Sequence, residues 1–144
     1  MRFNGEWLQC DDGIVRPVIR AEIETNSGSW RALELLVDTG ADRTVLSANV
    51  LESLNLATIE PRDGIGGVGG LVDSVAVKTR IRLTRDDGMK ATFHGEYAAC
   101  AEHEALDMSV LGRDILEIFA VIVDRPSEVI AMLGGRHHYI VEEH

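Results

Sequence analysis

Hydrophobic and polar residues alternate along much of the chain, which is the pattern of β-strands with one buried face. The alternation is cleanest over residues 75–83 and returns over 90–97 after the turn Asp86-Asp87-Gly88. These two segments are therefore predicted to pair as an antiparallel hairpin. Weaker versions of the pattern predict further strands over residues 19–24, 30–37, 119–123 and 129–133.

Helical signals are few. Ser47 can cap a short helix that runs through Leu54, and a second helix is predicted over residues 113–119, directly after Gly112. The sequence therefore predicts an all-β domain with one or two short helices. Residues 1–17 are expected to form an extension that can be loose, residues 18–134 the folded domain and residues 135–144 a tail.

The composition of the chain argues against several classes of binding partner. A chain of 144 residues has the length of one domain, and its net charge of −10 argues against binding to nucleic acid or to an anionic membrane. No apolar run approaches the roughly 20 residues that cross a bilayer, and the N-terminus lacks a secretory signal, so a cytoplasmic location is expected. Cys100 with His103, and His137 with His138, lack the second ligand pair of a metal site.

One aspartate follows an unusually apolar segment. Leu35-Leu36-Val37 is predicted to be buried on both faces, and it delivers Asp38 into the interior. An ionised carboxylate there costs several kcal/mol unless it is hydrogen-bonded, paired or protonated. Thr39 offers a hydroxyl, and Gly40 allows a sharp turn that brings its own N–H close. Taken alone, Asp-Thr-Gly also fits an ordinary turn at a strand end.

A second segment, residues 63–71, holds five glycines in nine residues, interleaved with Ile65, Val68 and Leu71. A phosphate-binding loop would open a helix or carry a lysine before Ser or Thr, and neither condition is met. A hairpin tip that opens and closes over a bound chain fits this composition better, because such a lid must be locally weak. The alternative interpretation is a merely flexible loop.

The third segment is residues 109–116, which contains Gly112 and Arg113. Its plain interpretation is a strand, a glycine and a helix start. The plain interpretation does not account for Arg113, because a guanidinium beside a turn usually binds a carboxylate through two hydrogen bonds. Asp42 is the candidate partner.

Together, these segments resemble the retropepsin-like (retroviral-type) aspartic peptidases, including their non-viral bacterial relatives. Leu36–Leu46 resembles the catalytic loop of that family, Ile65–Leu71 its glycine-rich flap, and Leu111–Leu116 the segment that packs behind the loop. The viral chains stop soon after their Gly-Arg segment, whereas this chain continues to His144. Its terminal strands therefore need not be arranged as in the viral enzymes.

The resemblance implies a closed β-barrel monomer with a flap hairpin. The chain carries one Asp-Thr-Gly, so it also implies a homodimer that joins two copies of the motif. The catalytic residues implied are Asp38, Thr39 and Gly40. The supporting residues implied are Ala41, Asp42, Gly112 and Arg113, and the flap residues implied are Ile65, Gly66, Gly67, Val68, Gly69 and Gly70.

The activity implied is that of an aspartic endopeptidase acting on extended polypeptides, without metal or cofactor. As in aspartic proteases generally, two carboxylates about 3 Å apart cannot both ionise, so one keeps a proton while the other activates a water. Ala41, Ile65, Val68 and Val110 are candidate pocket walls, which predicts hydrophobic residues beside the cleaved bond. The alternative is a catalytically silent dimer of the same fold that binds peptides or acts as a scaffold.

Overall fold

β-strands predominate in the computed structural model, which describes residues 1–59, 65–67, 70–72 and 74–143. The strands are β1 (Arg2–Asn4), β2 (Glu6–Gln9), β3 (Val15–Glu24), β4 (Trp30–Val37), β5 (Val45–Leu46), β6 (Ile65–Gly67), β7 (Gly70–Val72), β8 (Ser74–Thr84), β9 (Lys90–Cys100), β10 (Val110–Leu111), β11 (Phe119–Asp124) and β12 (Val129–Gly134). The helices are α1 (Ala48–Leu54) and α2 (Arg113–Leu116). Within the described ranges, no helix has the length and apolar character needed to cross a membrane.

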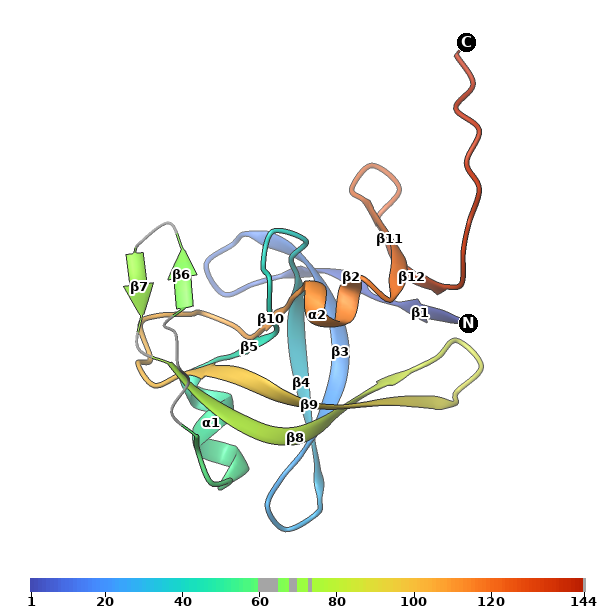
Figure 1. Cartoon of the computed structure of the whole chain (residues 1–144). Coiled ribbons are helices and arrows are strands. Elements are labelled where there is room, and N and C mark those ends of the chain that lie inside the picture. The colour runs from blue at the N-terminus through green and yellow to red at the C-terminus, as the bar shows by residue number, and fades with distance from the viewer. Residues whose placement is uncertain (60–64, 68–69, 73, 144) are drawn as a thin grey trace.

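Six of these strands close into a barrel (Figure 1). Backbone pairing links β3, β4, β10, β5, β9 and β8 in that order, and Ala21–Ile23 of β3 then pairs with residues 81–83 of β8 to complete the ring. β2 extends this sheet beside β3. The pairs β4–β10 and β5–β9 run parallel. The predicted all-β barrel with short helices is confirmed.

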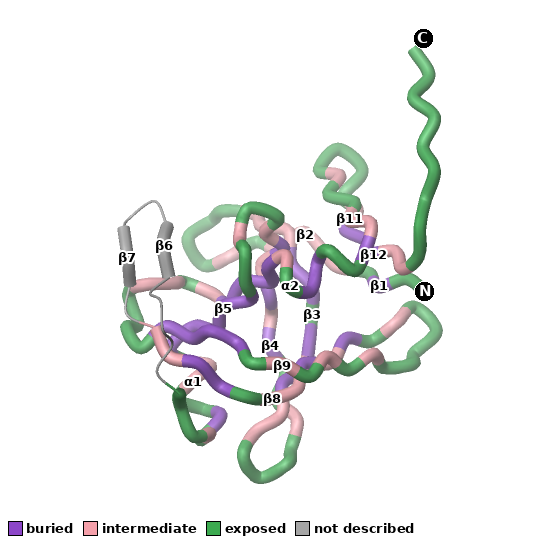
Figure 2. Tube along the Cα trace, in the orientation of Figure 1, coloured by how far each residue is buried: buried purple, intermediate pink, exposed green. Residues whose placement is uncertain are grey.

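Buried residues lie along the barrel strands (Figure 2), and most of them are aliphatic. In β8, Val77, Ile81 and Leu83 are buried and Lys78 is exposed, as the alternation predicts. Full burial of one such side chain stabilises the fold by roughly 1.5–3 kcal/mol. Other fully buried core residues are Ile19, Ile23, Leu35, Leu46, Leu54 and Leu111.

The N-terminal residues are part of the fold, which differs from the loose extension expected from the sequence. β1 pairs with β12, and Phe3 is completely buried with its ring edge-on to Phe119 at 5.4 Å between centroids. Gly5 allows the chain to pass close to the barrel, because a Cβ there would lie 2.3 Å from the Val18 carbonyl oxygen. Segments of three and four residues are too short to show a period, so the pattern missed β1 and β2.

The C-terminal part forms the predicted hairpin of β11 and β12, and β1 adds to it, giving a three-stranded sheet in the order β1-β12-β11. α2 ends at Leu116 and not at Phe119, because Phe119 already belongs to β11. Residues 135–143 carry no secondary structure, are exposed and extend away from the body (Figure 1).

A network of ion pairs lies where β3 pairs with β8 to close the barrel, and it predicts that the stability of the fold depends on pH. The Arg82 guanidinium donates to both oxygens of Glu22 at 3.1 and 3.0 Å, and Lys90 Nζ approaches Glu22 at 2.8 Å. These partners, Arg82 above all, lower the pKa of Glu22 from 4.5 to about 2. Since the folded pKa is depressed, this stabilisation is present above the unfolded value and is lost as the pH falls toward 2.

Glu22→Gln is therefore expected to lower the free energy of unfolding by about 1 kcal/mol at pH 7, or roughly 2–4 °C in melting temperature. Glu96→Gln, at an exposed position of β9, is the matched control and is expected to melt as the wild type does. Thermal melts at pH 7 and pH 3 measure both. A difference between Glu22→Gln and wild type that is as large at pH 3 as at pH 7 would contradict this assignment.

Candidate active site

Asp38 lies in a turn just beyond the last residue of β4. Its backbone N–H donates to the Leu111 carbonyl at 3.2 Å, which ties the turn to β10. Its Oδ1 accepts the Gly40 N–H at 2.9 Å, and its carbonyl accepts the Ala41 N–H at 3.2 Å. The carboxylate is thus held by its own turn, as the Asp-Thr-Gly sequence predicts.

The burial of this segment differs from the prediction. Leu35 and Val37 are buried, but Leu36 and Asp38 are half-buried and Thr39 and Gly40 are exposed. β4 carries the aspartate to the rim of the barrel and not into its interior. Because Asp38 keeps access to solvent in the single chain, it needs no buried counter-charge there.

Arg113, the first residue of α2, holds the far side of the turn. Its Nη1 donates to the Thr39 carbonyl at 3.0 Å, and its Nη2 forms an ion pair with Asp42. Its backbone N–H also donates to the Ala41 carbonyl at 2.8 Å. The predicted pairing of Arg113 with Asp42 is therefore present, and one side chain bridges two points of the loop.

The sequence did not predict a second connection, between Thr44 and Asp114. Thr44 is completely buried, and both its N–H and its hydroxyl donate to Asp114 Oδ1, at 2.9 and 2.7 Å. The Thr44 hydroxyl oxygen in turn accepts the Gly112 N–H at 3.2 Å. No local signal could reveal this contact, because the two side chains are 70 residues apart.

Gly112 lies where two backbone segments cross. A Cβ built on it would lie 2.2 Å from the Arg43 carbonyl carbon and 2.8 Å from the Thr44 nitrogen. Its φ of −99° is open to any residue, so close approach and not backbone conformation requires the glycine. This contact presses the loop after Asp38 against the start of α2.

The glycine-rich segment contains a hairpin of β6 and β7 that projects beyond the barrel in Figure 1. Ile65 pairs with Val72, Gly66 with Leu71, and Gly67 with Gly70. Val68 and Gly69, which the sequence also assigns to the flap, lie outside the described residues.

Two adjoining hollows lie beside β4. The smaller, of about 250 Å³, has Leu36 and Val110 among its lining residues, and these two pair across β4 and β10 just before Asp38. Alternate residues of a strand share a face, so Leu36 is on the face toward which Asp38 continues. Ala105, Leu106 and Met108 add apolar walls, and Arg16, Glu104 and Asp107 complete the lining.

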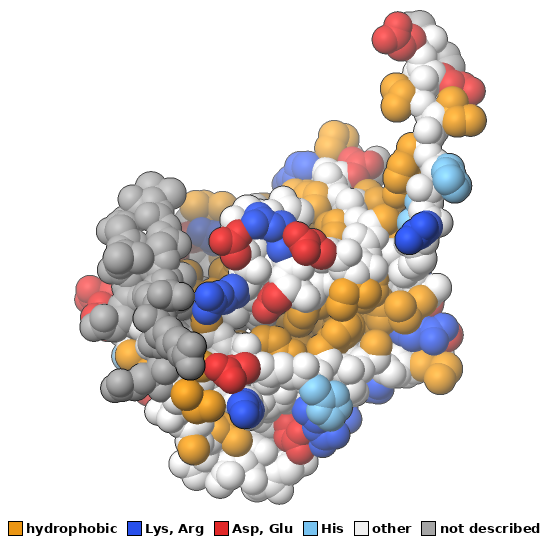
Figure 3. All heavy atoms as spheres, in the orientation of Figure 1, with side chains coloured by type: hydrophobic (Ala, Val, Ile, Leu, Met, Phe, Trp, Pro, Cys, Tyr) orange, Lys and Arg blue, Asp and Glu red, His pale blue; other side chains and the backbone are white. Residues whose placement is uncertain are grey.

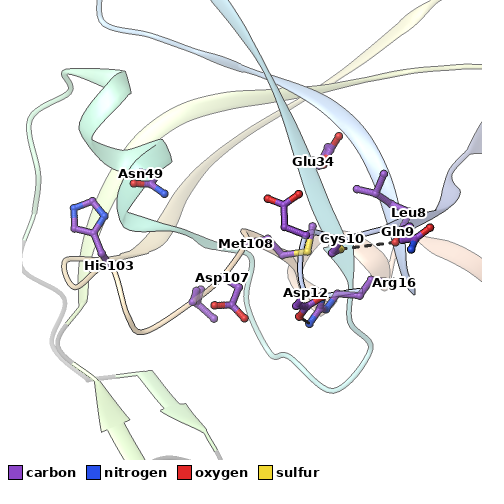
Figure 4. Close-up of a pocket in the computed structure, with 12 residues that line it drawn as sticks. Leu8, Gln9, Cys10, Asp12, Arg16, Glu34, Asn49, His103, Asp107 and Met108 are labelled. Atoms are coloured by element: carbon purple, nitrogen blue, oxygen red, sulfur yellow. Dashed lines mark hydrogen bonds and ion pairs between the residues drawn. The ribbon is translucent and has the colours of Figure 1, made fainter. Parts of the chain in front are cut away.

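The larger hollow, of about 630 Å³, shares Arg16, Leu106, Asp107 and Met108 with the smaller one. Asp12 and Arg16 lie at one end of it, and Asn49 and His103 at the other (Figure 4). Arg16 donates to both Asp12 oxygens at 2.9 and 2.7 Å, which lowers the pKa of Asp12 to about 2 and raises that of Arg16. The two hollows together form a space beside β4 with apolar and charged portions, and Asp38 is not among the residues that line either of them.

Comparison with known proteins agrees with this geometry. A family model described as aspartyl protease matches residues 21–115. No curated protein matches the chain.

The solved structures that are similar to this chain include two retroviral-type proteases. The EIAV protease in complex with the inhibitor HBY-793 is 28% identical, with a TM-score of 0.53 over 71% of this chain and 86% of that one. A retropepsin-like aspartic protease from Rickettsia conorii is 17% identical, with a TM-score of 0.58 over 92% of this chain and 91% of that one. The second likeness is one of fold alone, and the barrel described above is retropepsin-like.

Proposed function

Since this chain belongs to the aspartyl protease family, we propose that it is an aspartic endopeptidase whose active site forms when two copies bring their Asp38 carboxylates together. The observation that carries this proposal is the position of Asp38. It is held by the Gly40 N–H in a turn whose Thr39 and Gly40 are exposed, and the chain has no second Asp-Thr-Gly.

The chemistry follows from two close carboxylates. Like charges about 3 Å apart do not both ionise, so the pair holds one proton between them. The ionised Asp38 takes a proton from a water, which attacks the scissile carbonyl, while the other donates its proton to the carbonyl oxygen. The roles reverse as the amine leaves. Because both protonation states are needed, the rate is expected to fall on both sides of an optimal pH.

Extended polypeptides are the proposed substrates. The β6–β7 hairpin is a candidate flap, whose backbone can pair with an extended chain while side-chain pockets select residues. The smaller hollow is apolar at Leu36 and Val110, which pair across β4 and β10 just before Asp38, and this supports a preference for hydrophobic residues next to the cleaved bond. A digest of a peptide library tests this preference.

The test of the function is cleavage of unfolded casein between pH 4 and pH 8, at protein concentrations that span the monomer–dimer transition. Activity per chain is expected to rise with concentration until dimers predominate, because a single chain supplies one Asp38. Cleavage absent from a protein that sediments as a dimer would favour the peptide-binding or scaffold alternative.

Arg113→Lys is expected to lower kcat about tenfold with little change in KM or in melting temperature. A lysine ammonium cannot bridge the Thr39 carbonyl and Asp42 together as the guanidinium does, so the turn beside Asp38 loosens. Exposed ion pairs contribute less than about 1 kcal/mol to stability, so the fold should persist. Arg85→Lys, at the ion pair of half-buried Arg85 with exposed Asp87 in the β8–β9 turn, is the control. Equal kcat values for the two variants would argue against a positioning role.

A further inference from the structure

The larger hollow beside β4 has the size of a ligand site, and the chemistry proposed above does not use it. Its volume of about 630 Å³ lies within the roughly 300–1,000 Å³ that ligand pockets span. Its lining includes the turn between β2 and β3, Asn49 of α1 and the loop of residues 101–109 between β9 and β10. Leu106, Asp107 and Met108 of this loop also line the smaller hollow, so the two spaces adjoin.

The charges in this lining do not cancel. Arg16 donates to both oxygens of Asp12, so that pair carries no net charge. Glu34 is likewise engaged in an ion pair at 2.9 Å. Within the described part of the chain, Asp11 and Asp107 form no ion pair, and both side chains are exposed. The hollow therefore offers two carboxylates to a positively charged group.

This excess of acid differs from the mixed charge elsewhere on the molecule. Figure 3 shows acidic and basic side chains interspersed over α2 and the barrel face around it. The loop of residues 101–109, by contrast, carries Glu102, Glu104 and Asp107 and holds no lysine or arginine. His103 of this loop contacts the Glu52 carboxylate at 2.6 Å. A cation in the hollow would therefore be attracted by this loop.

Apolar side chains form the rest of the wall beside these carboxylates. Leu8, Leu106 and Met108 are half-buried and line the hollow. Asp107 lies between the end with Asp12 and the end with His103 in Figure 4. Long basic side chains lay their methylene groups on apolar surface and keep the charged end among polar groups. Lysine and arginine match both portions of the hollow, whereas a glutamate would be repelled.

The position of the hollow relative to Asp38 indicates which part of a substrate could enter it. Leu36, which lines the smaller hollow, comes two residues before Asp38 on an extended segment, so their Cα atoms are about 7 Å apart. The larger hollow begins beyond the smaller one. An extended polypeptide advances about 3.3 Å per residue, so the larger hollow corresponds to roughly three to five residues from the cleaved bond.

We propose that the larger hollow is a distal substrate subsite for a lysine or arginine side chain, with Asp107 and Asp11 as its specificity-determining residues. This inference rests on the proposed function, because one extended polypeptide has to reach both Asp38 and the hollow. Asp107 lines both hollows and Asp11 only the larger one. The substrate class is therefore a polypeptide with a hydrophobic residue beside the cleaved bond and a basic residue farther along the chain.

Peptides that differ only in carrying Lys, Gln or Glu at one of these distal positions test the subsite. At the position that enters the hollow, kcat/KM is expected to fall in the order Lys, Gln, Glu, by up to about fivefold at each step and mainly through KM. Asp107→Asn should remove most of this preference, and Asp107→Lys should reverse it in favour of Glu. Glu96→Gln, which removes one negative charge from an exposed position on β9, is the matched control and should keep the wild-type preference. Circular dichroism checks that each variant is folded.

Binding of the same peptides to Asp38→Asn, measured by fluorescence anisotropy, separates the subsite from the chemistry. Tighter binding of the Lys peptide, with no cleavage by the wild type, would support the subsite and not the peptidase proposal. Equal cleavage and equal binding of the three peptides at every position would overturn the subsite and leave the peptidase proposal standing. A preference for Lys that folded Asp107→Lys retains would place the basic side chain elsewhere on the molecule, and the proposal fails.

Discussion

Asp38→Asn is expected to reduce casein cleavage at least ~10³-fold at the optimal pH, because an amide can neither take a proton from water nor return one to the leaving amine. Dimerisation and melting temperature should stay close to wild type, since asparagine keeps an oxygen that can accept the Gly40 N–H. Initial rates at matched dimer concentration, with sedimentation and thermal melts alongside, measure these effects. Cleavage by the variant at wild-type rates would remove Asp38 from the chemistry.

Mixing the two proteins tests whether the site is shared between chains. When an equal amount of Asp38→Asn is added to the wild type and subunits exchange freely, roughly half of the wild-type chains enter mixed dimers. Activity should then fall to about half. Met89→Lys, which changes an exposed side chain in the β8–β9 turn and leaves Asp38 intact, is the control. Its addition in the same amount is expected to raise activity in proportion to the added chains. Unchanged activity on addition of Asp38→Asn, with exchange demonstrated, would place a complete site within one chain.

The barrel could be predicted from the sequence where strands are long enough to show a period. Over β8, a buried residue recurs at Val77, Ile81 and Leu83, and the turn at Gly88 marks the hairpin. β5 and β10 have two residues each and show no period. They are strands only because they pair with distant segments, as Val110 does with Leu36. Such strands follow from the closed topology and not from local pattern.

Only part of the candidate site could likewise be predicted from the sequence. The Arg113–Asp42 ion pair could be anticipated because both residues carry charge and flank recognisable turns. The Thr44–Asp114 contact could not, because a threonine beside an apolar strand gives no sign of its partner. The burial of Asp38 was overestimated, because the apolar run before it indicated an interior position. That run is compatible with an aspartate at the barrel rim, which a second chain would cover under the proposed dimer.

Gly112→Ala is expected to cost at least about 3 kcal/mol of stability, or roughly 6–12 °C in melting temperature, and to abolish cleavage. The added Cβ would meet backbone atoms of Arg43 and Thr44, which no rotamer change can move aside. Relief requires α2 to separate from the loop, which weakens the Gly112 N–H bond to the Thr44 hydroxyl and the Arg113 contacts with that loop. Thermal and urea unfolding measure the loss.

Gly88→Ala is the matched control, because the Gly88 φ is +85° and nothing lies within 4 Å of the added Cβ. The Gly88→Ala substitution should lower the free energy of unfolding by only about 1–2 kcal/mol, the strain of a left-handed backbone. Cleavage under the same assay conditions should therefore persist. The comparison separates close packing from conformational strain, since Gly112 has a φ of −99° that alanine adopts freely. If Gly112→Ala melts no lower than Gly88→Ala, the loop after Asp38 can yield to the added methyl group. The rigid crossing of that loop with α2 would then not be what holds Asp38 in place.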